Sequence, residues 1–307
     1  MSENRKIYFH IGAHKTASTF LQANLRASRE ALANAGLDVV LRQDVLATPF
    51  AKELGKVSQD RHDPEEISSK AAQSLRKVLP KGTNDVLVTC EDLVSSLKIQ
   101  DFYQHLGKAA QYICKALPKF DVHFILYIRR QPDYIESVYM QNVHLGRSIK
   151  FERYLERANA VDLSWLKVAD AMAGAVGPER VAVRPFETIR SLGEEAFLRQ
   201  FLTICGLRAP EAFTVSDEIG RSRAANRSYS ALAMKIARRV QPLLEEKQDQ
   251  KALRKFLQEN FSTATHPRAE LLDESTRSAI TARYEPSNRE LFTRYDLGSD
   301  GKALEYY

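Results

Sequence analysis

The sequence predicts an α/β protein with a central parallel sheet flanked by helices and with a mostly helical C-terminal region. Short apolar runs alternate with longer stretches in which apolar residues recur at helical spacing. This alternation is typical of parallel strands whose connecting helices cover both faces of a sheet. The 307 residues contain no Gly/Ser/Pro-rich tract, repeat or low-complexity run that would mark a linker. We therefore expect a single domain over 1–307, with its core at about 5–210 and a helical extension at about 211–307.

The predicted strands are short apolar runs, and they lie at 7–11, 37–41, 86–89, 122–128 and 181–184. The helix after the first run places Leu21, Leu25 and Leu32 on one apolar stripe that faces the sheet. The expected C-terminal helices lie at 229–244, 248–261 and 273–295. Pro286 is expected to break the last of them. Because open parallel sheets bind ligands beyond the carboxyl ends of their strands, a site is expected in the turns that follow the strands.

The turn after the first strand has the composition of an anion-binding loop. Gly12 is followed three residues later by Lys15 and then by several hydroxyl residues, just before a helix begins. Backbone N–H groups at a helix N-terminus attract an anion, glycine allows close approach, and lysine adds positive charge. The expected contacts are Gly12, Ala13, His14, Lys15, Thr16, Ala17, Ser18 and Thr19. The loop departs from the nucleotide-triphosphate pattern G-x-x-x-x-G-K-[ST], because His14 rather than glycine precedes Lys15.

A second phosphate-binding element is predicted at the end of the strand at 122–128. Arg129 leaves this strand, and Ser137 follows eight positions later on the next predicted helix. A guanidinium can bind two phosphate oxygens at once, and the serine can donate a further hydrogen bond from the adjoining helix. Arg130 is the alternative to Arg129, although it stands one residue closer to Ser137.

The two elements together resemble the sulfotransferases that use PAPS, the 3′-phosphorylated adenosine phosphosulfate donor. The loop from Gly12 to Thr19 is similar to the one that holds the 5′-phosphosulfate of PAPS. Arg129 and Ser137 are similar in spacing to the pair that binds its 3′-phosphate, and 179–187 resembles a strand that ends in an aromatic–acidic pair. The resemblance implies a three-layer, P-loop-like fold and a donor site for PAPS, with PAP as the product.

The resemblance also implies roles in the transfer. Lys15 would clamp the transferring group and stabilise charge on the departing phosphate. Glu91, which follows the strand at 86–89, is the first candidate for the base that takes the acceptor's proton, since many members of the family carry a histidine or glutamate there. His14 is the competing base. The alternative role of Glu91 or Asp92 is to cap a turn.

A late loop supplies the last candidate contact with the donor. Several sulfotransferases fold an Arg/Lys-Gly loop over the 3′-phosphate, and 219–223 matches it poorly, because the order and spacing of its residues differ. Arg221, with Arg223 as its alternative, is therefore a candidate donor contact. Charges of a solvated loop are the other interpretation of these two arginines.

Composition and charge limit the cellular context. The net charge of +6 suits a protein that attracts a multiply charged anion, and it suits nucleic-acid or membrane-surface binding as well. The 3 cysteines are too few and too widely spaced for a disulfide framework or a zinc site, so no metal is expected. Neither a signal peptide nor an apolar segment long enough to span a bilayer is recognisable. Together with the resemblance, this predicts a cytoplasmic, bacterial enzyme without membrane insertion or a nucleic-acid partner.

The sequence thus predicts a sulfotransferase that moves a sulfuryl group from PAPS by in-line transfer. The expected acceptor is a hydroxyl of a saccharide or another small molecule, and an amine is the second choice of acceptor group. A P-loop kinase that uses ATP and Mg²⁺ stays open, although the missing second glycine and the lack of a recognisable Mg²⁺ aspartate argue against it. A non-catalytic nucleotide- or polyanion-binding module is the third possibility. No motif identifies the acceptor or the oligomeric state.

Overall fold

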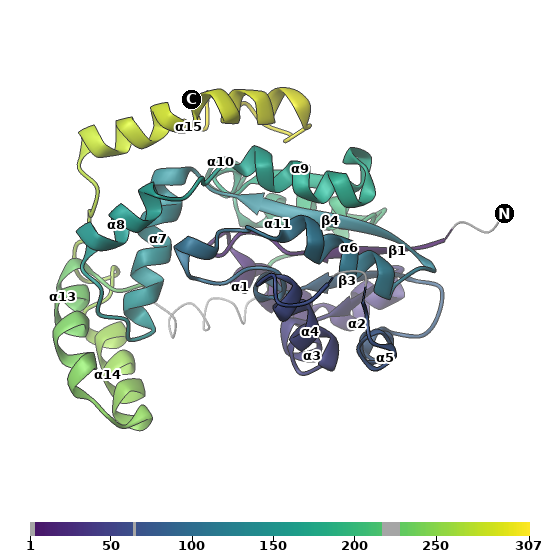
Figure 1. Cartoon of the computed structure of the whole chain (residues 1–307), viewed down its shortest axis with the longest axis horizontal. Helices are drawn as coiled ribbons and strands as arrows, with labels where there is room; N and C mark the ends of the chain where they lie inside the picture. The colour runs from purple at the N-terminus through teal and green to yellow at the C-terminus, as the bar shows by residue number, and fades with distance from the viewer. Residues whose placement is uncertain (1–3, 64–65, 217–227) are drawn as a thin grey trace.

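The computed structural model describes residues 4–63, 66–216 and 228–307 (Figure 1). Within these residues, one sheet of five strands has the order β2-β3-β1-β4-β5. The strands are β1 Arg5–His10, β2 Leu37–Val40, β3 Asp85–Thr89, β4 Phe120–Ile128 and β5 Val181–Pro185. Every neighbouring pair is parallel, with Ile7 beside Val86 of β3 and Val122 of β4. The predicted central parallel sheet is therefore confirmed.

Helices cover both faces of the sheet. Those of the N-terminal half are α1 Ser18–Ala27, α2 Arg29–Asn34, α3 Arg42–Leu46, α4 Pro49–Val57, α5 Ser69–Val78 and α6 Leu106–Ala116. Those of the second half are α7 Gln131–His144, α8 Phe151–Asn159, α9 Trp165–Val176, α10 Thr188–Leu192, α11 Glu194–Ile204, α13 Ala231–Val240, α14 Lys247–Asn260 and α15 Glu274–Arg294. The C-terminal region is mostly helical, as predicted. Figure 1 shows α13 beside α7 and α15 alongside α9, and α14 packs against α13.

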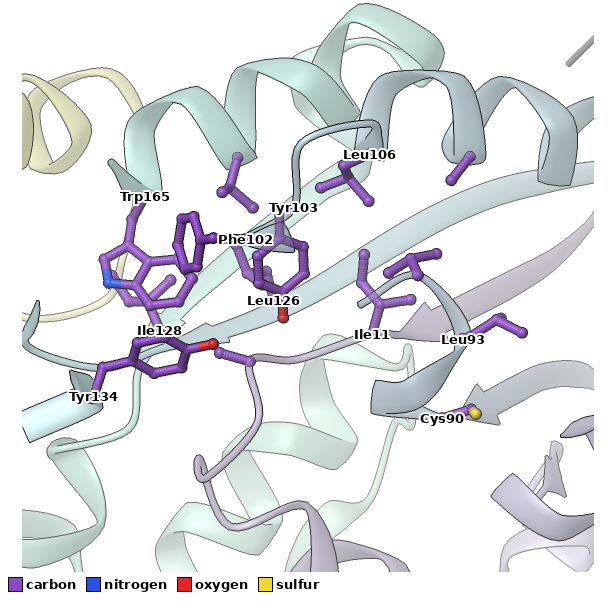
Figure 2. Close-up of a cluster of buried hydrophobic side chains, with 14 of the residues drawn as sticks. Ile11, Cys90, Leu93, Phe102, Tyr103, Leu106, Leu126, Ile128, Tyr134 and Trp165 are labelled. Carbon is purple, nitrogen blue, oxygen red and sulfur yellow. The ribbon is translucent and has the colours of Figure 1, made fainter. Parts of the chain in front are cut away.

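Side chains of alternate strand residues pack into two separate apolar cores, one on each face of the sheet, as expected for a sheet covered on both faces. In β1, Ile7 and Phe9 pack into the core that holds α4, α6 and α9. Tyr8, between them, packs into the core that holds α1, α2 and α11. The first of these cores includes an aromatic cluster around Trp165 (Figure 2).

Two sequence-based boundaries in the helices were wrong. Leu21 and Leu25 lie on α1 but Leu32 lies on α2, because the chain turns at Ser28, although all three side chains share one core as predicted. Pro286 does not break α15, which continues to Arg294. Burial of side chains on both sides of the proline, including Tyr284 and Asn288, holds the helix together despite the missing N–H.

Among the described residues, no helix has both the length and the apolar character needed to cross a membrane.

Candidate active site

The order of the strands places the two predicted phosphate elements next to each other. β1 and β4 are neighbours in the sheet, but the chain continues from β1 towards β2 on one side and from β4 to β5 on the other. The connections after β1 and β4 therefore diverge at the carboxyl edge, which is where open α/β sheets bind ligands. Backbone hydrogen bonds hold the first connection against β4, from Ile11 N to Ile125 O at 3.1 Å and from Ala13 N to Tyr127 O at 2.8 Å.

The loop between β1 and α1 has an unusual backbone. Lys15 and Ala17 have positive φ values of 69° and 65°, a left-handed conformation that is rare for residues other than glycine. Such conformations persist only where the surroundings impose them, and they are frequent at ligand-binding turns. The Thr16 hydroxyl is buried and donates to the carbonyl oxygen of Ala13 at 2.5 Å, which closes the loop.

The first turn of α1 is well suited to hold an anion. Ala17 occupies the position before the helix and, as an alanine, has no side-chain oxygen that could accept from the N–H groups of the first turn. Ser18 Oγ is buried and has no hydrogen-bond partner among the described residues. Free N–H groups and a hydroxyl at the positive end of the helix dipole are the donors that a phosphate or sulfate requires.

Gly12 is needed for packing inside the protein. A Cβ at this position would lie 2.6 Å from Nε2 of His10, a ring that is buried, and 3.5 Å from the backbone nitrogen of Tyr127. The ring of His10 is held by Thr89 Oγ1, 3.0 Å from Nδ1, and burial lowers the pKa of His10 to about 3. His10 is therefore a neutral core residue, and glycine leaves room for it.

Replacing Gly12 with alanine is expected to destabilise the protein by about 1–3 kcal/mol, because the added methyl group must displace a packed ring or backbone. Urea unfolding of Gly12→Ala would measure this. Gly55→Ala is the matched control, since a Cβ at Gly55, within α4, meets nothing within 4 Å. The control should be stabilised by roughly 0.5–1 kcal/mol through helix propensity. Equal stability of Gly12→Ala and the wild type would contradict the packing role.

Lys15 lies at the surface of the loop and points towards α7. Its Nζ donates to Oε1 of Gln141 at 3.1 Å. The pKa of Lys15 is lowered, first by the loss of water around the ammonium group and second by the positive charge of Arg129. An anion bound near both cations would oppose both effects, because an opposite charge favours the protonated amine.

Arg129 links the two elements directly. Its Nη1 donates to Lys15 O at 2.9 Å and to Ser137 Oγ at 3.1 Å, so the predicted arginine–serine pair and the loop after β1 meet at one guanidinium. Arg129 and Ser137 are both buried. No ion pair joins Arg129 to a carboxylate in the described part of the chain. Burial is the largest of the causes that lower its pKa.

Trp165 fixes the backbone from which Arg129 projects. Its indole Nε1 donates to the carbonyl oxygen of Arg129 at 2.7 Å. Figure 2 shows the indole packed among Phe102, Tyr103 and Tyr134. The centroid of the indole lies 4.9 Å from that of the Phe102 ring and 5.2 Å from that of the Tyr134 ring. The tryptophan is therefore a core residue that also orients the candidate phosphate-binding arginine.

Arg130 has a different environment from Arg129. It pairs with Asp133 at 2.6 Å and with Glu305, and its backbone N–H donates to Glu187 Oε1 at 3.0 Å. Glu187 in turn accepts from the hydroxyl of Tyr306 at 2.8 Å. Asp133 and Glu305 thus pair with Arg130 directly, whereas Asp133 and Glu187 act on Arg129 through their charges without an ion pair among the described residues. This difference favours Arg129 of the two for binding an anion.

Two further arginines contribute positive charge near Arg129, and neither was predicted from the sequence. Arg190 lies on α10, in the connection that follows β5, and Arg268 lies in the segment between α14 and α15. Both side chains are exposed, and both charges lower the pKa of Arg129. The place of Arg190 just after a strand could have identified it, whereas nothing in the sequence around Arg268 does so.

One candidate base, His14, lies within the loop, and the other, Glu91, follows the neighbouring strand. Glu91 begins the short 3-10 helix η1 Glu91–Leu93 directly after β3, and Nε2 of Gln22 donates to its Oε2 at 2.7 Å. His14 is buried, and its Nε2 has no partner among the described residues. Burial lowers the pKa of His14, and the nearby charges of Asp92 and Glu91 partly offset this effect. Asp92 itself is paired with Arg42.

The predicted donor contacts Arg221 and Arg223 fall in 217–227, outside the described residues.

The fold has a distant likeness to a solved structure. The crystal structure of a sulfotransferase from Alicyclobacillus acidocaldarius is similar at a TM-score of 0.44 and 15% sequence identity, over 80% of this chain and 99% of that chain. No protein-family model matches the sequence. No curated protein matches it either. A likeness this distant carries no functional conclusion, so the functional assignment rests on the residues of the site.

Proposed function

We propose that this protein is a sulfotransferase that transfers a sulfuryl group from PAPS to a hydroxyl of a small molecule or saccharide. The observation that carries the proposal is the guanidinium of Arg129, which contacts Ser137 Oγ and Lys15 O at once. It joins the arginine–serine pair to the loop after β1 at the switch point of a parallel sheet. A ligand with phosphate groups at two ends fits such a pair of elements.

The donor would lie along the carboxyl edge of the sheet. Arg129 and Ser137 would hold its 3′-phosphate, and the loop from Gly12 to Thr19 would hold the 5′-phosphosulfate through backbone N–H groups, hydroxyls and Lys15. As the acceptor oxygen bonds to sulfur, the bond from sulfur to the phosphate oxygen breaks and PAP leaves. Lys15 would stabilise the charge that develops on this phosphate oxygen.

A base must take the proton of the acceptor hydroxyl. Glu91 is the first candidate, because it follows β3 at the same edge of the sheet as the loop and is held in place by Gln22. His14 is the competitor, since its lowered pKa keeps the imidazole neutral near pH 7 and Nε2 has no hydrogen-bond partner among the described residues. Turnover of Glu91→Gln and His14→Gln would separate the two.

The decisive experiment is calorimetry of the whole chain with adenosine 3′,5′-bisphosphate, AMP and ATP, each with and without Mg²⁺. A sulfotransferase should bind the bisphosphate most tightly and without Mg²⁺. Preference for ATP with Mg²⁺ would favour a kinase instead. Transfer of radiolabelled sulfate from PAPS to a panel of hydroxylated acceptors would then separate an enzyme from a non-catalytic binding module.

Removal of Arg190 or Arg268 is expected to weaken binding of the bisphosphate by about two- to fivefold each, as for other exposed charge interactions. The losses should shrink in high salt, because salt screens exposed charges. Titrations of Arg190→Gln and Arg268→Gln at two salt concentrations would test this. Arg208→Gln, which removes another exposed arginine, is the control. An equal loss in the control would mean that only net charge matters.

A further inference from the structure

The face of α7 that carries Ser137 continues past the donor elements. Ser137, Gln141 and His144 are spaced four and three residues apart, so they line up along one face of the helix. At 1.5 Å per residue, His144 lies about 10 Å along the axis from Ser137. Arg129 contacts Ser137, and Lys15 contacts Gln141. His144 is therefore the next position beyond Lys15, on the side away from Arg129.

The helical C-terminal region covers this end of α7. The ring of His144 lies against that of Tyr229, with centroids 4.8 Å apart. Tyr229 stands just before α13, which packs against α7 and against α14. Arg254 lies on α14. We call Gln141, His144, Tyr229 and Arg254 the distal cluster.

Polar groups of the distal cluster are buried without partners. The side chain of Tyr229 is 4% exposed, and its hydroxyl has no hydrogen-bond partner among the described residues. Nε of Arg254 is also buried, and it too has no hydrogen-bond partner among the described residues. Burial of unpaired donors is unfavourable, and native proteins usually satisfy such groups with a ligand or water.

The charges near the distal cluster are positive. Burial lowers the pKa of His144 to about 4, and the charges of Arg254 and then Lys15 add to this effect. The imidazole is therefore neutral near pH 7, and the charges of two cations act on it. Arg254 also acts on Tyr229, whose pKa burial nevertheless raises to about 12, so its hydroxyl keeps its proton and can donate. The cluster thus presents a guanidinium and neutral donors.

We propose that the distal cluster binds an anionic group, a carboxylate or a sulfate ester, on the acceptor. This inference rests on the proposed function. In-line transfer requires the acceptor to approach sulfur from the side opposite the leaving phosphate. The distal cluster lies beyond Lys15, away from Arg129 and Ser137, and its unpaired donors match an oxyanion. The acceptor class is therefore an acidic hydroxylated molecule, such as an oligosaccharide that contains uronic acid.

The test uses the full chain saturated with adenosine 3′,5′-bisphosphate. Calorimetry would measure binding of several oligosaccharides that contain glucuronic acid, each compared with its carboxyl-reduced counterpart. We expect at least one acid to bind about tenfold more tightly than its reduced form, as one charged hydrogen-bonded contact allows. Arg254→Gln and Tyr229→Phe should remove most of this difference. Lys255→Gln, an exposed lysine on the same helix, should retain it.

The outcomes separate this inference from the function on which it rests. Absence of any preference for the acids across the set would overturn the inference while leaving the donor site intact. A loss of bisphosphate affinity in Arg254→Gln would also overturn it, because Arg254 would then serve the donor. If the wild type fails to bind the bisphosphate at all, the proposed function is refuted. Thermal melting of each variant would show that the protein is folded.

Discussion

Replacing Lys15 with alanine is expected to lower turnover with PAPS by about a hundredfold to a thousandfold, as loss of an electrostatic stabiliser of the transition state typically does. The reason is geometric. Nζ of Lys15 projects from the loop that would hold the phosphosulfate, and it lies 3.1 Å from Oε1 of Gln141 on the facing helix α7. In the proposed donor complex this position is next to the leaving oxygen, which would become charged. Measurement of kcat and KM for PAPS would check this prediction.

Two comparisons make the Lys15 result specific. Lys119→Ala removes an exposed lysine just before β4, at the opposite edge of the sheet from the loop, and should leave kcat unchanged. A Lys15→Ala variant with normal kcat and a raised KM for PAPS would contradict the catalytic role. It would mean that Lys15 contributes equally to binding the donor in its ground state and in the transition state.

Loss of Arg129 is expected to weaken binding of adenosine 3′,5′-bisphosphate by about tenfold to a hundredfold while changing the affinity for AMP little. The guanidinium is buried and, among the described residues, is paired with no carboxylate, so its charge is available to the 3′-phosphate that AMP lacks. Ser137→Ala should act in the same direction with a smaller loss. Calorimetry of the wild type, Arg129→Ala and Ser137→Ala with both nucleotides would give the six affinities.

Arg129 also contacts Lys15 O, so its removal could disturb the loop itself. Arg129→Lys retains the positive charge and serves as the conservative variant, and Ser137→Ala removes only a hydroxyl. If Arg129→Ala lowers the affinity for AMP and for the bisphosphate by the same factor, the 3′-phosphate binds elsewhere. Equal affinity of Arg129→Ala and the wild type for the bisphosphate would refute the assignment.

The strands could be predicted from the sequence because buried parallel strands are continuous apolar runs that need no distant partner to be recognised. All five predicted runs form strands of the sheet, and their ends differ from the prediction by a few residues. The errors arose in helices, where packing outweighs local preference. Pro286 lacks the N–H that a helix uses, yet burial of neighbouring side chains carries α15 through it.

Spacing to Ser137 favoured Arg129 over Arg130, but it did not reveal the surroundings of either arginine. The carboxylates that surround Arg130 include Glu187 and Glu305, which are 57 and 175 residues away along the chain. Only the folded chain brings them there. Likewise, Arg190 and Arg268 act on Arg129 from other segments, so no local pattern around Arg129 indicates them.

The sequence by itself determined the strand–loop–helix order and the residue types at the two turns, because backbone propensity and the chemistry of glycine, lysine, arginine and serine are local. Tertiary structure decided which side chains meet. The switch point between β1 and β4 joins Lys15 to Arg129 across 114 residues, and packing of the C-terminal helices places Tyr229 against His144. Contacts of this kind depend on how distant segments pack, and that information lies in the whole chain rather than in any motif.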